Sequence, residues 1–184
     1  MQIIGLVGEK GSGKETFGNL LMELVKGKKI FRIRFSDILN YTLKLWDLDL
    51  TRENLQNLAI AMDGAYGAGT LSQAIAKQIK DSEADIVILD GIRWQSDVDL
   101  LKSFPKNILV YITADLDIRY HRLKLRQEKK DEAKTYQQFM KEEQAQNELL
   151  IPRIGSKADI KITNNASLEG LKEKVREFTS SKLA

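Results

Sequence analysis

The sequence predicts an α/β fold in which helices cover both faces of a five-stranded parallel sheet. Five short β-rich segments alternate with long helical segments along the chain. Two of the β-rich segments are apolar almost throughout, as strands covered on both faces are. The first segment leads directly into a glycine-rich loop and then into a helical pattern. Strands that alternate with helices form βαβ units, so we expect one domain built on a parallel sheet.

The predicted strands are short and the helical segments between them are long. The strands are expected at Gln2–Val7, Ile30–Arg34, Ile86–Leu89, Ile108–Ile112 and Asp159–Ile162. Apolar residues at helical spacing predict amphipathic helices over Lys14–Lys26 and Leu168–Phe178. Two further helical stretches, at about 37–80 and about 116–153, are longer than a crossover between parallel strands requires. We expect both stretches to be insertions within the single domain.

Composition narrows the class of protein. The chain has 184 residues, a net charge of +3, no cysteine and a single histidine, His121. Disulfides and thiolate metal sites are therefore excluded, and one histidine does not make a zinc site. The charge is too small for a dedicated nucleic-acid binder, and no apolar run approaches the ~20 residues of a membrane span. We expect a cytoplasmic enzyme with neither a nucleic-acid nor a membrane partner.

The most specific motif is a phosphate loop between the first strand and the first helix. Glycines let the backbone curl so that several N–H groups point inward and form an anion-binding nest. The N-terminus of the following helix adds its partial positive charge there, and Lys14 adds a mobile point charge. The loop follows a strand, has its glycines and lysine at the expected spacing, and leads into a helix. Together these features predict a P-loop that binds ATP. Its residues are Gly8, Glu9, Lys10, Gly11, Ser12, Gly13, Lys14, Glu15 and Thr16.

One position departs from the usual P-loop. A Ser or Thr normally follows the lysine and its hydroxyl reaches Mg²⁺, whereas here Glu15 follows and Thr16 comes next. A carboxylate could hold Mg²⁺ directly or through water, since both are hard, but it could equally repel a triphosphate. Alternatively, Glu15 is only a favourable acidic residue in the first helical turn. The candidate metal ligands are Glu15, Thr16 and Asp90.

The loop resembles that of the nucleoside monophosphate kinase group, whose pattern is G-x-x-G-x-G-K-x-[ST]. The matching residues are Gly8, Gly11, Gly13, Lys14 and Thr16. Phage-type deoxynucleoside monophosphate kinases are the nearest likeness, and an archaeal family of uncharacterised kinase-like proteins is similar along most of the chain. Dephospho-coenzyme A kinases are also similar. The resemblance implies a P-loop kinase that uses ATP and Mg²⁺, with an acceptor-binding insertion at about 37–80 and a lid at about 116–153.

An aspartate follows the third predicted strand. Ligands of open α/β sheets lie beyond the carboxyl ends of the strands, so Asp90 is expected to face the P-loop and hold Mg²⁺ through its water shell. The alternative is an ordinary Asp-Gly turn with Gly91. Arg93 lies three residues further on, and its guanidinium fork suits a phosphate on the acceptor. A surface position is the alternative for this arginine.

Candidate acceptor-binding residues follow the second predicted strand. Ser36 and Asp37 come directly after it, and Asp37 could act as a general base or bind a sugar hydroxyl. Either residue could instead be the N-cap of the next helix. Arg52 and Gln56 lie four residues apart on one helix face, which resembles a face that meets the acceptor in phage-type kinases. Plain solvent exposure is the alternative for that face.

Three arginines share one face of the helix predicted after the fourth strand. Arg119, Arg122 and Arg126 are spaced i, i+3 and i+7 along it, at the carboxyl edge of the sheet. There they could close on the transferring phosphoryl group and neutralise its charge. A salt-bridged solvent face is the alternative.

Two other features bear on the ligands. The resemblance implies that the loop after the last strand passes near the adenine, which adds Asn164, Asn165 and Ala166 to the ATP-binding residues. Trp46 and Trp94 could stack on a base, although packing is the more common role of such side chains.

The sequence therefore predicts a phosphotransferase that moves the γ-phosphoryl group of ATP to a (deoxy)nucleoside monophosphate or a similar phosphorylated small molecule. Dephospho-coenzyme A kinase and phosphomevalonate kinase are alternatives on the same scaffold. A nucleotide-dependent switch or ATPase that acts on a protein partner is an alternative of another class. We expect a monomer or a homodimer. Catalytic roles are expected for Lys14, Asp37, Asp90, Arg93, Arg122 and Arg126.

Overall fold

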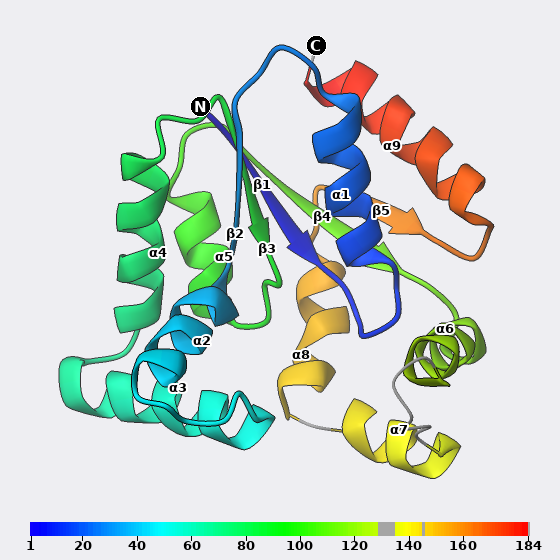
Figure 1. Cartoon of the computed structure of the whole chain (residues 1–184). Coiled ribbons are helices and arrows are strands. Elements are labelled where there is room, and N and C mark those ends of the chain that lie inside the picture. Colours follow the sequence, from blue (N-terminus) through cyan, green and yellow to red (C-terminus); the bar gives the residue numbers. More distant parts are fainter. Residues whose placement is uncertain (129–134, 145, 184) are drawn as a thin grey trace.

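A parallel sheet runs through the centre of the molecule, and helices cover both of its faces (Figure 1). The computed structural model describes residues 1–128, 135–144 and 146–183. Among these residues, no helix combines the length and the apolar content that crossing a membrane requires. The predicted five-stranded parallel sheet flanked by helices is confirmed.

The carboxyl ends of three neighbouring strands lie together at one edge of the sheet. Its strands are β1 (Gln2–Val7), β2 (Ile30–Arg34), β3 (Ile86–Asp90), β4 (Asn107–Thr113) and β5 (Ile160–Thr163). Their order is β2-β3-β1-β4-β5, and every neighbouring pair is parallel. The register places Arg34 of β2 and Leu6 of β1 opposite Asp90 of β3. The carboxyl ends of β1, β2 and β3 therefore meet where the predicted P-loop begins.

Two apolar cores lie on opposite faces of the sheet, because successive strand residues point to opposite sides. Ile86 and Ile88 join the core beneath α1 (Lys14–Leu24) and α9 (Leu168–Lys182). In that core the rings of Phe17 and Phe178 meet edge to face, with their centroids 5.6 Å apart. The intervening residues of β3 join the other core, beneath α4 (Thr70–Asp81), α5 (Gln95–Lys102) and α8 (Gln146–Gly155).

The insertion at about 37–80 begins with two helices at the edge of the sheet. Helices α2 (Phe35–Leu45) and α3 (Arg52–Tyr66) lie below that edge in Figure 1 and pack through Leu39, Leu43 and Leu58. Between them, Trp46 leaves 59% of its surface exposed. Helix α4 then returns to the main core. The insertion thus projects α2 and α3 beyond the strand that leads into them.

The stretch at about 116–153, expected to form a lid, divides into parts with different surroundings. Helices α6 (Leu116–Glu128) and α7 (Tyr136–Glu143) lie together, with the rings of Tyr120 and Phe139 5.5 Å apart. Helix α8 instead buries Ile151 and Ile154 in the main core. Its part in the expected lid is therefore corrected to a core helix. The polar residues on either side hid its short apolar run, Leu149–Ile151.

We predict that Ile151→Ala lowers the free energy of unfolding by about 2–5 kcal/mol, because it leaves a cavity beneath the sheet. Leu149→Ala on the same helix is the matched control, since that side chain is 55% exposed. The control is expected to change the free energy by about 0.5 kcal/mol or less. Urea unfolding followed by circular dichroism measures both. Equally small effects would contradict the place of α8 in the core.

Candidate functional site

The phosphate loop joins β1 to α1 and needs glycine at two positions. Gly11 and Gly13 have φ angles of 80° and 94°, in the left-handed region that other residues disfavour. A Cβ on Gly13 would lie 2.3 Å from Nδ2 of Asn164. That amide nitrogen donates to the carbonyl oxygen of Ser12 over 2.8 Å. Asn164, expected to lie near the adenine, thus also holds the phosphate loop in shape.

The side chain of Glu9 fastens the start of the loop to β4. One carboxylate oxygen accepts hydrogen bonds from the hydroxyl of Tyr111 and, over 3.2 Å, from that of Thr113. Burial and the nearby carboxylate raise the pKa of Tyr111 to about 12. The phenol therefore stays protonated and available as a donor at neutral pH. Of the residues expected to bind ATP, Glu9 uses its side chain to support the loop.

The carboxylate of Asp90 is the centre of the site, and only 1% of its surface is exposed. One oxygen accepts from Nζ of Lys14 over 2.6 Å. The other accepts from Nη2 of Arg32 over 2.5 Å and from Nε of Arg34 over 3.1 Å. Burial by itself would raise the pKa of Asp90, but Lys14 and Arg32 outweigh it and lower the pKa to about 2. Asp90 is therefore ionised at neutral pH and holds the lysine of the loop.

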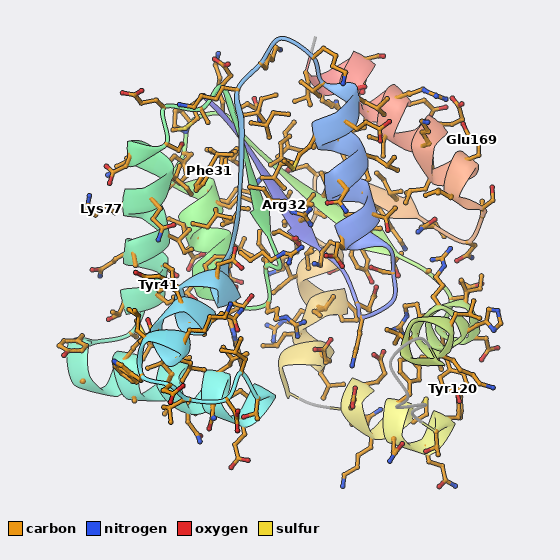
Figure 2. The ribbon with its side chains drawn as sticks, in the orientation of Figure 1. Phe31, Arg32, Tyr41, Lys77, Tyr120 and Glu169 are labelled. Carbon is orange, nitrogen blue, oxygen red and sulfur yellow. The ribbon has the colours of Figure 1, made fainter. Side chains whose placement is uncertain are left out.

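Strand geometry explains why these cations converge. Arg32 and Arg34 are two residues apart, so both side chains leave β2 on the face that carries α1. Gly18 of α1 provides room, since a Cβ there would lie 3.0 Å from Cζ of Arg32. Figure 2 places Arg32 between β2 and α1, where Nη1 also donates to Asn19 over 2.5 Å. Arg32 is thus enclosed between the sheet and the first helix.

Two of the candidate metal ligands, Glu15 and Asp90, share the partner Arg34, whereas Thr16 lines a cavity beside the loop. Glu15 is half exposed, and one of its oxygens accepts from Nη2 of Arg34 over 2.9 Å. Asp90 uses both oxygens for cations, so it can reach Mg²⁺ only if one of these pairs breaks. Thr16 is half-buried. In the described part of the chain, no three His, Cys, Asp or Glu residues form a group that could hold a metal alone. Mg²⁺ commonly uses one or two carboxylates plus substrate phosphates, so the exposed Glu15 fits that ion.

The cavity beside the loop has a volume of about 220 Å³. Arg122 lines it and donates to the carbonyl oxygen of Ala166 over 3.1 Å. Asn165 turns away towards α6, where its side-chain oxygen accepts from the N–H of Asp115 over 2.9 Å. Ligand pockets for whole small molecules are usually larger, about 300–1,000 Å³, so this cavity suits one part of a nucleotide. Its lining includes Thr16, Arg122, Leu125, Asn164, Leu168 and Leu171.

Helix α7 is tied to the phosphate loop directly by one ion pair and indirectly by a second ion pair, through Arg119 of α6. Nζ of Lys10 lies 2.7 Å from a carboxylate oxygen of Glu142. Arg119 is buried, donates to the carbonyl oxygen of Lys10 over 3.2 Å and pairs with Glu143 over 2.7 Å. Its guanidinium also lies 5.7 Å from the ring centroid of Phe139. These contacts hold α7 against the loop.

The three arginines predicted to share one face of α6 have different surroundings. Arg119 is a buried link between the loop and α7, whereas Arg122 lines the cavity. The side chain of Arg126 lies outside the described residues. The expectation that all three face one phosphoryl group is therefore corrected for Arg119, whose partners are protein groups.

The predicted acceptor residues lie on α2 and α3. A carboxylate oxygen of Asp37 accepts from the backbone N–H of Arg34 over 3.0 Å, which closes the first turn of α2. The N-cap is therefore Arg34 and neither Ser36 nor Asp37, although Asp37 stabilises the same helix end from its first turn and keeps an exposed side chain. Ser36 is half-buried beside it, and Gln56 is exposed on α3. The side chain of Arg52 lies outside the described residues.

Arg93 lies in the connection between β3 and α5 and pairs with Glu148 of α8. The arginine side chain is 38% exposed, whereas that of Glu148 is 7% exposed. Asp97 fixes the connection, because it accepts from the backbone N–H groups of Arg93 and Trp94 over 2.9 Å and 3.0 Å. Burial raises the pKa of Asp97 to about 6, although both N–H groups favour its charged form.

Sequence reasoning missed three residues that shape the site: Arg32, Arg34 and Glu148. The two arginines had a visible signal, since they occupy alternate positions of an otherwise apolar strand. Charged residues at that spacing on a covered strand indicate a shared buried partner. Glu148 had no comparable signal, because it lies in a segment rich in glutamate and glutamine.

The chain is similar to proteins of family UPF0200 over nearly its whole length. One from Sulfurisphaera tokodaii is 29% identical over 178 residues, which cover 97% of this chain and 96% of that protein. One from Methanocaldococcus jannaschii is 27% identical over 171 residues, which cover 92% and 84%. No family model matches the chain.

Solved structures show the same fold at low sequence identity. TT1252 from Thermus thermophilus has a TM-score of 0.62 at 18% identity and covers 98% of this chain and 97% of its own. Shikimate kinase from Aquifex aeolicus has a TM-score of 0.55 at 17% identity, with the same coverage. The chain therefore has the α/β P-loop fold of such kinases, and the resemblance to the P-loop kinase group and to an archaeal family is confirmed.

We predict that Asp97 makes the stability of the protein fall as pH rises from about 4 to about 6. The folded pKa of about 6 exceeds the ordinary 3.8, so the native state binds more protons than the unfolded state in this window. Asp97→Asn should remove a fall of about 1–3 kcal/mol in the free energy of unfolding. Urea unfolding at pH 4, 5, 6 and 7 measures this for both proteins. If the free energy of unfolding depended on pH in the same way in both proteins, the raised pKa of Asp97 would be contradicted.

Proposed function

We propose that the protein is an ATP-dependent kinase that transfers the γ-phosphoryl group to a (deoxy)nucleoside monophosphate or a similar phosphorylated acceptor. The observation that carries the proposal is the cluster at Asp90, where Lys14 of the phosphate loop meets two arginines of β2. Cations held beside a phosphate loop suit a reaction whose catalysis is positioning and charge neutralisation. The fold shared with shikimate kinases agrees with this class of reaction.

In the proposed reaction, an oxygen of the acceptor attacks the γ-phosphorus, and the bond to the oxygen that bridges the β- and γ-phosphates breaks to release ADP. Lys14 leaves Asp90 to bind the phosphates, while Arg32 stays and keeps the buried carboxylate paired. Arg122 of α6 faces the nucleotide from the cavity that it lines, and the catalytic role of Arg126 stays a prediction from the sequence. When bound, Mg²⁺ supplies further charge neutralisation at the phosphates, and Glu15 with Thr16 would hold it.

On the acceptor side, Arg93 binds the acceptor's phosphate. It is half exposed, and its partner Glu148 fixes its position from the core side. Asp37 hydrogen-bonds a hydroxyl of the acceptor through its exposed carboxylate, with Ser36 beside it. Gln56 is exposed on α3 and is proposed to contact the acceptor, and the same role for Arg52 stays a prediction from the sequence.

A panel of acceptors with ATP and Mg²⁺ tests the proposal. It contains the common ribo- and deoxyribonucleoside monophosphates, dephospho-coenzyme A, phosphomevalonate and shikimate. ADP and phosphorylated product are measured together. Product from a nucleoside monophosphate supports the proposal, and product from another compound reassigns the acceptor. ADP release without any product would favour an ATPase or a switch that acts on a protein partner.

We predict that Lys14→Ala abolishes phosphoryl transfer and leaves the fold intact. The lysine supplies the charge that follows the transferring group, and Asp90 keeps two arginines as partners without it. Steady-state turnover and the thermal midpoint measure the two effects. Unchanged turnover in a folded variant would contradict the assignment of the loop.

Arg93→Ala is expected to raise the acceptor KM and lower kcat, while ATP binding without acceptor stays almost unchanged. Loss of a charge-assisted contact to phosphate typically costs on the order of 1.5–3 kcal/mol, or roughly ten- to a hundredfold. A two-substrate kinetic grid and calorimetric ATP titrations measure these effects. Weakening of ATP binding to the same degree would show that the acceptor phosphate is not held by Arg93.

Glu148→Gln is the matched control for this variant. It removes the buried charge but keeps a side-chain oxygen that can still accept from the guanidinium of Arg93 and hold it in position. The acceptor KM is therefore expected to stay the same or fall. If Glu148→Gln raised the acceptor KM as much as Arg93→Ala does, the ion pair between Arg93 and Glu148 would have a structural role, and Arg93 would not be assigned to the acceptor's phosphate.

A further inference from the structure

We propose that Arg34 is a second residue that binds the acceptor's phosphate, and that this phosphate replaces Glu15 as the partner of Arg34. The inference rests on the proposed kinase function and adds a residue and a coupling to it. It assigns a ligand to the one arginine of the Asp90 cluster that is substantially exposed.

Arg34 differs from its neighbour Arg32 in exposure and in partners. The side chain of Arg32 is 11% exposed and is enclosed by Asp90, Asn19 and Gly18. That of Arg34 is 40% exposed. Arg32 is therefore the permanent partner of the buried carboxylate, whereas Arg34 has a side that a ligand can reach.

The two contacts of Arg34 have different strengths. Its Nε donates to Asp90, which is almost fully buried, over 3.1 Å. Its Nη2 donates to Glu15, whose side chain is 50% exposed, over 2.9 Å. The first contact orients the guanidinium, and the second is an exposed ion pair, which is weak because water screens both charges. A phosphate dianion, which an arginine fork binds in a bidentate manner, outcompetes such a partner.

The position of Arg34 in the fold indicates that the anion it binds is the phosphate of the acceptor. Arg34 ends β2 at the carboxyl edge of the sheet, directly before the helix that carries Ser36 and Asp37. The cavity on the nucleotide side is lined by the phosphate loop, α6 and α9, and Arg34 is not part of it. An anion that meets Arg34 directly before α2 therefore lies next to the proposed acceptor residues.

The exchange also releases Glu15 from Arg34. Its carboxylate occupies the position from which a hydroxyl reaches Mg²⁺ in the usual P-loop. While Glu15 pairs with Arg34, its charge is partly neutralised and its oxygen is engaged. Once the acceptor's phosphate takes Arg34, Glu15 becomes available to Mg²⁺. Binding of the acceptor and of the metal should therefore favour each other.

Calorimetric titration with inorganic phosphate tests the exchange without turnover. The protein is first saturated with adenylyl imidodiphosphate, which fills the phosphate loop, and metal is removed with a chelator. The variants are Arg34→Ala, Glu15→Gln and the double variant. Arg176→Ala is the matched control, because that arginine is 44% exposed and pairs with Glu173 on α9. Thermal midpoints report whether each variant is folded.

The competition predicts effects of opposite sign. Arg34→Ala should weaken phosphate binding about tenfold or more, whereas Glu15→Gln should strengthen it about two- to fivefold. The double variant should bind like Arg34→Ala alone, because without Arg34 there is no guanidinium for Glu15 and phosphate to compete for. In a parallel Mg²⁺ titration, saturating phosphate should tighten metal binding in the parent and have no such effect in Glu15→Gln.

Three outcomes would overturn the inference. They are unchanged phosphate affinity in Arg34→Ala, an equal loss in Arg176→Ala, and no phosphate binding by the parent or by Glu15→Gln. Absence of phosphorylated product from every acceptor in the panel would instead sink the proposed function. Because phosphate binding is measured without turnover, the two failures are distinguishable.

Discussion

A single buried negative charge organises the site. Asp90 is 1% exposed, and a carboxylate that far from water is costly unless cations and hydrogen bonds surround it. The requirement accounts for the two arginines of β2 and for the glycine of α1 beneath which Arg32 passes. It also accounts for the resting position of Lys14. The phosphate loop, the edge strand and the first helix are therefore joined through one side chain.

The phosphate loop itself is shaped by residues far away in the chain. Asn164 after β5 holds the carbonyl of Ser12, and Tyr111 of β4 holds the carboxylate of Glu9. The glycine at position 13 is needed for two reasons, since its φ is positive and Asn164 occupies the space of a side chain. The anion-binding shape of the loop is thus a property of the whole sheet edge as well as of the glycine pattern.

The fold could be predicted from the sequence because its signals are local. Apolar strands, amphipathic helices and the glycine-lysine loop each lie within one segment, and every strand was placed to within one residue. The charge partners could not be predicted in this way. Asp90 meets Arg32 and Arg34 across 58 and 56 residues, so their pairing depends on sheet order and register. Helix α8 was taken for lid because its two buried isoleucines lie among polar residues.

The two tryptophans of the chain both lie close in sequence to residues of the proposed acceptor site. Trp46 follows α2 and Trp94 follows Arg93, and they are 59% and 45% exposed. Neither lines the cavity on the nucleotide side. Movement of α2 and α3 towards the β3–α5 connection would change the polarity around both indoles, whereas filling of the nucleotide cavity would not touch them. The protein thus carries native fluorophores that would distinguish occupation of the proposed acceptor site from occupation of the cavity beside the phosphate loop.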